Sequence, residues 1–595
     1  MRERCSLQDR PRIARAVGCL LAACALAAGA ASAQATSGAP EVSSGWTTKS
    51  PVSSRHFMVA TANPLATRAG YDILRAGGNA IDAAIAVQLV LGLVEPQSSG
   101  LGGGALLLYD DARTKRLIAY DGRETAPAAA TPDRFLDAGG QPLAFYDAVI
   151  GGRSVGVPGT VALLETVHRH HGRLPWPRLF RRAIALAERG FPISPRLHVL
   201  VNAETHWSQA RARDYFVTPD GNARPIGFRL TNPAYARTLR ILAARGANAF
   251  YTGAIADDIV HTADSAVRNP GDMTRADLAR YRVKARKPVC DRYRAYRICG
   301  MPLPSSGGLT VLQALKMLEP YDIAAMGPAS FWSVHFVSEA ERLAFADRNV
   351  YMADPDFFRP PDGLLDDEYL HRRSLLISTT QSLGVASPGD PARREARARE
   401  LAWGEDAAAE FPSTSDIAIV DRDGNAVSMT TTIEDGFGSR LMTESGFLLN
   451  NELTDFSFVP VESGKPVANR VEPGKRPRSS MAPTVVYDRH GRIYALAGSA
   501  GGSLIIDHVI KTLIGMIDWK LDPQAAIALP NFGSRNGPTE LEKGTPIVAL
   551  QPKLRALGHE TRVMIDPSGA QAIARTPAGW IGGADPRREG VVMGQ

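Results

Sequence analysis

The chain has 595 residues, of which 44% are hydrophobic and 22% charged, so it can bury a large core divided among several domains. Its formal net charge is +7, but the first 33 residues hold five arginines against Glu3 and Asp9, which leaves +7 − 3 = +4 for the remainder. Acidic and basic residues are interleaved throughout that remainder, which argues against the concentrated basic surface of a nucleic-acid-binding protein.

Residues 1–33 have the features of a secretory signal peptide. A basic start precedes an apolar run, residues 16–30, that is too short to span a bilayer, and Ala31-Ser32-Ala33 fits a small-x-small cleavage site. A second interpretation stays open, because the stretch LAAC at 21–24 resembles a lipoprotein cleavage box that would leave a lipid-anchored Cys24. Both interpretations predict export, to the periplasm or out of the cell. No later segment has the length of apolar sequence that a membrane helix needs.

Residues 34–54 are rich in Ser, Thr, Gly and Pro and are predicted to form a flexible leader. The periodicity of the following sequence then predicts helices and strands in turn. Helices are expected at 67–77, 80–93, 160–172, 176–190, 233–245, 307–318 and 329–353, and strands at 105–109 and 117–120. The segment 385–412 has alternating charge and no apolar face, which predicts an exposed, mobile tail. Beyond it we expect strands at 417–420, 426–433 and 492–497, a glycine loop at 498–502 and a helix at 503–519.

Two clusters of polar or sulfur-containing residues raise the question of metals and disulfides. Cys290 and Cys299 are the two cysteines outside the signal region, and they flank a short predicted hairpin. A disulfide and a pair of buried thiols both stay open. His168, His170 and His171 end a predicted helix with no acidic partner in register, so we predict a solvated helix terminus and no metal site.

Thr414 stands before the first strand of the C-terminal region, in the tripeptide Pro412-Ser413-Thr414. Taken alone it is an ordinary loop threonine whose hydroxyl satisfies a backbone group. If the chain cut itself before Thr414, however, this residue would carry both a nucleophilic hydroxyl and a free α-amine as its base. An α-amine has a pKa of about 7.7–8, so it can accept a proton near neutral pH. Cleavage would therefore be the activating step.

Six further stretches support this hypothesis by their order and spacing. Downstream they read NNELTDFS (450–457), PGKRPRSSMAPT (473–484) and GSAGGS (498–503); upstream they read GGNAIDAA (77–84), SGLGGG (99–104) and PSSGG (304–308). Together with Thr414, these motifs resemble the small and large subunits of the γ-glutamyltranspeptidases, or glutathione hydrolases. The resemblance covers nearly all of the chain after the leader.

The resemblance implies an α+β fold, the four-layer αββα sandwich of the N-terminal nucleophile hydrolases. It implies a large subunit, residues 55–413, and a small catalytic subunit, residues 414–595, that form a heterodimer after self-cleavage. The implied substrates are γ-glutamyl amides such as glutathione, with water or the amine of an amino acid or peptide as acceptor. No metal or cofactor is implied, because the α-amine of Thr414 performs the proton transfer.

The same resemblance assigns the site residues. Thr414 is the nucleophile, Thr432 orients it, and the N–H groups of Gly501 and Gly502 stabilise the oxyanion. Arg123, Ser479 and Ser480 are expected to bind the substrate α-carboxylate. Glu434, Glu452 and Asp455 are expected to bind the α-ammonium. Thr432 and Gly502 are also expected to contact the substrate.

Two departures from the usual family pattern keep an alternative open. Glu434 stands where asparagine is common, and Ala500 stands where the glycine loop usually has proline. An acylase of the same fold that removes a dicarboxylic side chain from a β-lactam (a cephalosporin acylase) fits these departures. A non-catalytic periplasmic binding protein that never cuts itself is the alternative from another class.

Overall fold

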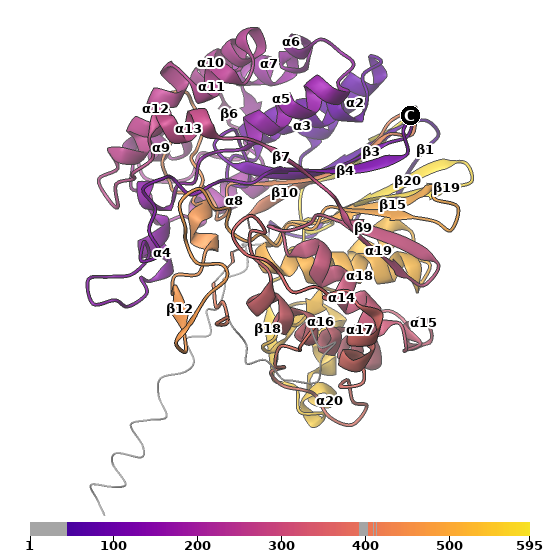
Figure 1. Ribbon diagram of the computed structural model, residues 1–595. Coiled ribbons are helices and arrows are strands. Elements are labelled where there is room, and N and C mark those ends of the chain that lie inside the picture. The colour runs from indigo at the N-terminus through magenta and orange to yellow at the C-terminus, as the bar shows by residue number, and fades with distance from the viewer. Residues whose placement is uncertain (1–43, 392–402, 409, 412) are drawn as a thin grey trace, which may run out of the picture. The chain divides into compact units, whose positions relative to one another are not determined.

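The computed structural model describes residues 44–391, 403–408, 410, 411 and 413–595 (Figure 1). The predicted signal peptide, Cys24 and most of the predicted leader lie outside these residues. Two seven-stranded antiparallel sheets lie face to face, and helices cover the outer face of each (Figure 1). This is the four-layer αββα arrangement expected from the sequence.

The sheet that contains Thr414 is called sheet B here. Its strands in spatial order are β21 (Val591–Gly594), β2 (Met58–Thr61), β10 (Thr414–Val420), β11 (Ala426–Thr432), β3 (Gly104–Asp111), β4 (Arg116–Gly122) and β7 (Lys284–Arg286). Strand β10 is buried along its whole length, so both of its faces pack against other layers. Ile417 and Ile419 face the helices, whereas Ala418 and Val420 face the second sheet.

The second sheet, sheet A, packs against the inner face of sheet B. Its strands in spatial order are β1 (Val52–Ser54), β20 (Gly579–Ala584), β19 (Gln571–Thr576), β15 (Ile493–Gly498), β14 (Thr484–Tyr487), β9 (Tyr296–Gly300) and β8 (Val289–Tyr293). Strands β15 and β19 lie against β10, which brings the glycine loop after β15 to the end of the sheet where Thr414 lies.

One helical layer covers sheet B. It contains α2 (Pro64–Arg75), α3 (Ala80–Val94), α5 (Thr160–His171), α6 (Trp176–Leu179), α7 (Arg181–Arg189), α8 (Pro195–Ala203), α9 (Ala210–Phe216), α10 (Pro233–Arg245), α11 (Asn248–Tyr251), α12 (Ala254–Asp264) and α13 (Arg275–Arg280), with α4 (Phe145–Val149) beside it. Helix α3 lies directly on β10 and β11 and is buried on all sides, as its continuous apolar sequence requires. Asn79 and Asp82 begin it with a capping box.

The other helical layer covers sheet A. It contains α14 (Gly307–Leu318), α15 (Ile323–Met326), α16 (Phe331–Tyr351), α17 (Asp367–Ser374), α18 (Ile505–Ile517), α19 (Pro523–Ala528) and α20 (Gln551–Ala556). The remaining short elements are β5 (Phe191–Pro192), β6 (Arg229–Leu230), β12 (Val461–Glu462), β13 (Lys465–Pro466), β16 (Phe532–Gly533), β17 (Thr539–Glu542), β18 (Thr561–Met564) and the 3₁₀ turns η1 (Gly152–Ser154), η2 (Glu452–Asp455), η3 (Gly502–Leu504) and η4 (Pro546–Leu550).

The predicted helices and strands are present, with shifts of a few residues at most of their ends. The bounds of α10 and α14 agree with the predicted ones. The helix predicted at 176–190 is two helices, α6 and α7, that meet at Phe180. The helix predicted at 503–519 begins as a 3₁₀ turn, because the chain leaves the glycine loop through Gly502 at a φ of +58°.

Two predictions of flexibility are wrong for the described residues. The end of the predicted leader forms strand β1, which pairs with β20, and Lys49 donates to the carbonyl oxygens of Asp585 (2.6 Å) and Arg588 (2.7 Å). The described end of the predicted 385–412 tail is buried, with Glu410 only 7% exposed. Both segments are held by partners that are far away in the sequence, so their local composition gave no sign of order.

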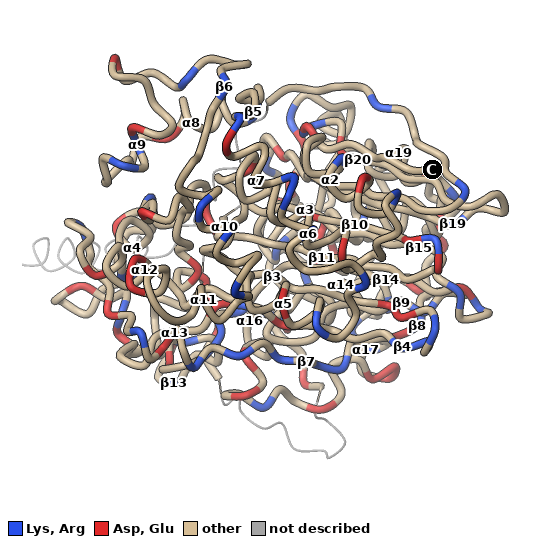
Figure 2. The backbone as a smooth tube through the Cα atoms, turned by 90° about the horizontal axis from the view of Figure 1, so that it is seen from above, with Lys and Arg blue, Asp and Glu red and all other residues tan. Residues whose placement is uncertain are grey.

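Cys290 and Cys299 pair directly across the β8–β9 hairpin and form a disulfide. Of the two states left open by the sequence, the structure therefore has the bonded one. Basic and acidic positions are interleaved along the backbone (Figure 2). None of the described helices combines the length and apolar character needed to cross a membrane.

Candidate active site

The β10–β11 hairpin places Thr414 beside Thr432. The two residues are directly opposite in the antiparallel register, and the turn between the strands is closed by Asp421, whose carboxylate accepts bonds from Asn425. Because the side chains of a strand alternate, Thr414 and Thr432 both point to the inner face, between the sheets. The eighteen-residue separation in sequence thus becomes a direct contact.

A chain of hydrogen bonds connects the proposed nucleophile to the peptide bond that precedes it. The Thr414 hydroxyl lies 3.4 Å from Thr432 Oγ1 and donates to it, and the Thr432 hydroxyl donates to the carbonyl oxygen of Ser413 at 2.8 Å. The backbone N–H of Glu434 also donates to Thr432 Oγ1, at 2.9 Å, and fixes its rotamer. Thr432 therefore contacts both the attacking hydroxyl and the carbonyl that would be attacked.

The glycine loop lines the same cavity as Thr414, through Gly502. Gly501 and Gly502 have φ values of +138° and +58°, in the region that favours glycine. His508 packs against Gly501, because a Cβ added at Gly501 would come within 2.9 Å of His508 Cε1. The Nε2 atom of His508 is 2.8 Å from Asp566 Oδ1. The glycine loop therefore packs on a buried His508–Asp566 pair.

The three acids assigned to ammonium binding lie together in the buried site. Burial, with Asp455 and Asp435 nearby, raises the pKa of Glu434 well above its ordinary value. Burial also raises the pKa of Asp455, to about 7, although Arg123 opposes this. Each acid has one buried oxygen with no hydrogen-bond partner among the described residues: Glu434 Oε1, Glu452 Oε2 and Asp455 Oδ1.

Arg123 is fully engaged with these acids in the uncut chain. Its two terminal nitrogens bind Glu452 and Asp455, and it donates to the carbonyl oxygens of Pro477 (3.2 Å) and Arg478 (2.8 Å). The sequence predicts Arg123 as a two-pronged ligand of a substrate carboxylate. In this structure its charge is instead shared between two carboxylates of the site itself.

Ser480 binds a carboxylate of the chain, that of Glu410. The hydroxyl of Ser480 donates to Glu410 Oε2, and Arg348 on α16 donates both to Ser480 Oγ (2.7 Å) and to Glu410 Oε1. Burial opposes ionisation of Glu410, but Arg348 and Arg478 outweigh it and lower its pKa to about 2. Ser479 lies alongside, where its carbonyl accepts from Ser306.

Nine of the ten predicted site residues line a single cavity, and Gly501 is adjacent to it. The cavity is lined by Arg123, Thr414, Thr432, Glu434, Glu452, Asp455, Ser479, Ser480 and Gly502, together with Glu410, Phe411, Met481 and Ile505. Its volume is only about 20 Å³, which holds little more than one water molecule. Glu410 and Phe411, which lie four and three positions before Thr414, form part of the lining of this cavity.

The sequence analysis missed three residues of this site. Glu410 fell within the predicted mobile tail, and Arg348 lies in a long buried helix whose sequence carries no mark of a binding role. Asp416 shares the inner face of β10 with Thr414, and a Cβ added at Gly498, at the start of the glycine loop, would come within 2.2 Å of its carboxyl. Burial raises the pKa of Asp416 to about 7. An acidic residue two positions after the nucleophile could have been noticed from the strand periodicity.

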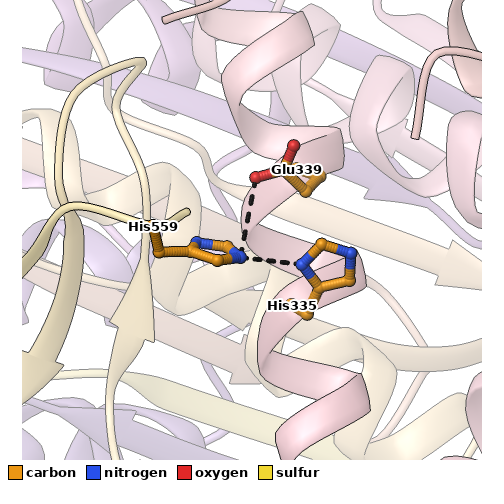
Figure 3. A group of neighbouring side chains, drawn as sticks. All are labelled: His335, Glu339 and His559. Atoms are coloured by element: carbon orange, nitrogen blue, oxygen red, sulfur yellow. Dashed lines mark hydrogen bonds and ion pairs between the residues drawn. The ribbon is translucent and has the colours of Figure 1, made fainter. Parts of the chain in front are cut away.

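A second buried cluster lies away from this cavity. His335 and Glu339 on α16 meet His559, which precedes β18, and the three could in principle hold a metal ion (Figure 3). His335 Nδ1 is 2.7 Å from His559 Nε2, and their other ring nitrogens contact the Ser378 carbonyl and the Thr539 hydroxyl, each at 2.7 Å. Every ring nitrogen thus already has a partner, so we interpret the cluster as a hydrogen-bonded junction.

The fold is an αββα sandwich, in which Thr414 begins a central strand and shares a cavity with a glycine loop from the facing sheet. This arrangement is typical of the N-terminal nucleophile hydrolases. The comparisons with known proteins agree with this class. The family described as Gamma-glutamyltranspeptidase matches residues 66–595. The chain belongs to the γ-glutamyltranspeptidase family and is an enzyme.

Three relatives illustrate the range of the family. A glutathione hydrolase proenzyme of Bacillus subtilis is 36% identical over 545 residues, which cover 90% of this chain and 91% of the relative. The acylase ACY 1 proenzyme of Pseudomonas sp. is 34% identical over 550 residues, which cover 90% of this chain and 93% of the relative. The crystal structure of a cephalosporin acylase from Bacillus halodurans superposes with a TM-score of 0.80 at 29% identity. The superposition covers 93% of this chain and 99% of the acylase chain.

Proposed function

We propose that this protein is an exported γ-glutamyltranspeptidase or glutathione hydrolase that activates itself by cutting the Ser413–Thr414 bond. The Thr414 hydroxyl attacks the carbonyl carbon of Ser413, whose oxygen already accepts a hydrogen bond from Thr432. The C–N bond breaks and leaves an ester on Thr414 Oγ1 with a free α-amine, and water then hydrolyses the ester. Residues 55–413 and 414–595 become the large and small subunits.

The mature site then uses the same hydroxyl on a γ-glutamyl amide. The new α-amine takes the proton of the Thr414 hydroxyl as its oxygen attacks the γ-carbonyl carbon. The N–H groups of Gly501 and Gly502 stabilise the oxyanion, and the amide nitrogen leaves as an amine after it receives the proton. Water or an acceptor amine then releases the γ-glutamyl group from the ester.

The observation that carries the γ-glutamyl specificity is the set of three unpartnered carboxylate oxygens. Glu434, Glu452 and Asp455 line one cavity, and each has one such buried oxygen without a hydrogen-bond partner among the described residues. A protonated α-amine has three N–H donors and no acceptor, so it matches three acceptors in both number and charge. Arg123 is one cation for three acids, so a second cation would offset the buried negative charge that remains.

An acylase that removes a dicarboxylic side chain is the second candidate, because acylases are among the relatives at similar identity and coverage. Its glutaryl group is a γ-glutamyl group without the α-amine. The three acids distinguish the two functions, since they have no role in binding a glutaryl chain.

Export is supported by two independent features. The first 33 residues have the pattern of a secretory signal. Cys290 and Cys299 are bonded, and disulfides persist in oxidising compartments outside the cytosol.

The decisive experiment examines Thr414→Ala and Thr414→Ser beside the parent. We expect the parent to give two bands on a denaturing gel and to release nitroaniline from γ-glutamyl-p-nitroanilide. Thr414→Ala should stay one band and be inactive, whereas Thr414→Ser, which keeps a hydroxyl, should still be cut. Normal cutting and turnover in Thr414→Ala would refute the function. Faster turnover of glutaryl- than of γ-glutamyl-p-nitroanilide by the parent would instead favour the acylase.

A further inference from the structure

The peptide bond between Ala500 and Gly501 supplies the first N–H of the proposed oxyanion hole. Glycine accepts φ values of either sign, so Gly501 places little restriction on the orientation of this peptide plane. Position 500 is commonly proline in the family, and a proline ring would stiffen the backbone there. Ala500 has no such ring, so contacts from outside the loop decide which way the Gly501 N–H points.

His508 holds the carbonyl end of this peptide bond. It lies in the first turn of α18, where side chains lean back toward the start of the helix and thus toward the loop. His508 Nδ1 is 3.2 Å from the carbonyl oxygen of Ala500. This oxygen can only accept, so the ring donates to it. Because C=O and N–H point in opposite directions across a trans peptide, the bond directs the Gly501 N–H away from His508.

Asp566 fixes the orientation of the His508 ring. Its Oδ1 lies 2.8 Å from His508 Nε2, and both side chains are buried. Burial opposes ionisation of Asp566, but His508, Arg587 and Lys511 outweigh it and lower the pKa of this carboxyl below its ordinary value. The carboxylate therefore keeps its charge and accepts from Nε2, which leaves Nδ1 facing Ala500.

The two residues before the glycines have a second support in Ser568. The Ala500 N–H donates to the Ser568 carbonyl oxygen at 3.2 Å, a bond that proline cannot make, and the Ser499 hydroxyl donates to the same oxygen at 3.0 Å. Ser499 Oγ also lies 3.2 Å from His508 Nδ1 and can accept from it. This chain thus restrains the loop through hydrogen bonds, to the segment that contains both Asp566 and Ser568.

We propose that His508 and Asp566 are positioning residues that hold the Gly501 N–H in the direction needed to stabilise the oxyanion. The inference rests on the proposed function and deepens it, because it names what keeps an oxyanion donor of that site in place. The described lining of the active-site cavity includes neither residue, so both act through the loop. Their loss should therefore lower kcat and leave KM nearly unchanged, because the oxyanion exists only after attack.

Two substitutions separate the two ring nitrogens of His508. The side-chain nitrogen of asparagine branches from Cγ, as Nδ1 does, and that of glutamine lies one atom further out, like Nε2. His508→Asn therefore keeps a donor for Ala500, whereas His508→Gln keeps a donor for Asp566 and loses the first one. In correctly cut enzyme we expect kcat to fall by about 30-fold in His508→Gln and by less than about fivefold in His508→Asn.

The substrate is whichever of γ-glutamyl- and glutaryl-p-nitroanilide the parent hydrolyses faster, because both acyl groups form the same oxyanion. If His508 only stabilised the fold by pairing with Asp566, glutamine would be the milder change. Equal losses of kcat in the two variants, or a larger loss in His508→Asn, would therefore overturn the proposal.

Asp566→Ala tests the second member of the pair. It frees the ring and should lower kcat by about tenfold in the parent, but by less than about twofold in His508→Gln, where no donor faces Ala500. Equal losses in the two backgrounds would show that Asp566 does not act through His508.

A crystal structure of uncut Thr414→Ala protein tests the same point without turnover. With His508→Gln added, we expect the peptide plane between Ala500 and Gly501 to turn, whereas with His508→Asn it should keep the orientation of the Thr414→Ala protein. An unchanged plane in both variants would refute the positioning role. An uncut or inactive parent would instead refute only the proposed function.

Discussion

At the scale of single residues, the hydroxyl of Thr432 contacts two groups of the site, whereas the sequence predicted only one contact. The sequence predicts that it orients the nucleophile. The structure shows it between the Thr414 hydroxyl, at 3.4 Å, and the Ser413 carbonyl oxygen, to which it donates at 2.8 Å. A donor on the carbonyl oxygen stabilises the charge that develops there during attack, so Thr432 is placed to promote the cutting step as well.

Thr432→Val should therefore slow self-cleavage by about 100-fold, the effect of losing one oxyanion donor. Valine has nearly the same shape as threonine, so the change removes the hydroxyl with little change in packing. Thr431→Val is the matched control, because the Thr431 hydroxyl faces the other side of the strand and donates to Gly104. The rate is measured as conversion of the single band into two after purification of uncut chain. Equal rates in the two variants would show that the hydroxyl has no role in cutting.

At the scale of elements, α16 connects two regions through its polar residues. Arg348 at its C-terminal end reaches the active site, and His335 nearer its start reaches His559 (Figure 3). The Ser378 carbonyl can only accept, so His335 donates to it through Nε2, and His335 Nδ1 lies 2.7 Å from His559 Nε2. His559 in turn accepts from Thr539, whose oxygen accepts from Arg342 at 2.7 Å.

This junction predicts a loss of stability in acid. Burial, Arg342 and His335 lower the pKa of His559 to about 3, whereas an unfolded histidine has a pKa of about 6.5. The folded base resists protonation, so its contribution is fully present above pH 6.5 and is lost as the pH falls toward 3. In that window unfolding takes up one proton, which corresponds to about 1.4 kcal/mol per pH unit.

Urea unfolding of the uncut Thr414→Ala chain at pH 7, 6, 5 and 4 measures this effect. His559→Asn should make the pH dependence less steep, whereas His490→Ala, a change in an exposed turn, should leave it as it is. An unchanged slope in His559→Asn would mean that this histidine is not responsible.

At the scale of the whole molecule, the proposed cut does not divide the structure into two separate bodies. In sheet B, β10, β11 and β21 come from the small subunit and the other four strands from the large one. In sheet A, β14, β15, β19 and β20 come from the small subunit and β1, β8 and β9 from the large one. In each sheet, strands of one subunit pair directly with strands of the other (β21 and β10 with β2, and β11 with β3, in sheet B; β1 with β20, and β9 with β14, in sheet A), so the two chains share hydrogen bonds and core.

The cut protein should therefore behave as one particle. We expect the two subunits to elute together in size-exclusion chromatography and to separate only in denaturant, because parting them would expose sheet edges and apolar core. Subunits expressed apart should be insoluble, and co-expression should restore a complex. Elution of a folded small subunit alone would contradict the shared-sheet arrangement.

The sequence by itself determined the family resemblance, because its motifs lie within short stretches of chain, and the resemblance in turn implied the αββα class and nine of the residues that line the cavity. Helices α10 and α14 could be bounded because each has a local apolar repeat and clear ends. Only the tertiary structure decided the state of Arg123, the burial of Glu410 and the pairing of His335 with His559. Each of these depends on side-chain partners from 62 to 332 positions away, such as Arg348 for Glu410 and Asp455 for Arg123. Buried charges are stabilised by whichever partner the fold brings near, and that distance in sequence leaves no local pattern to detect.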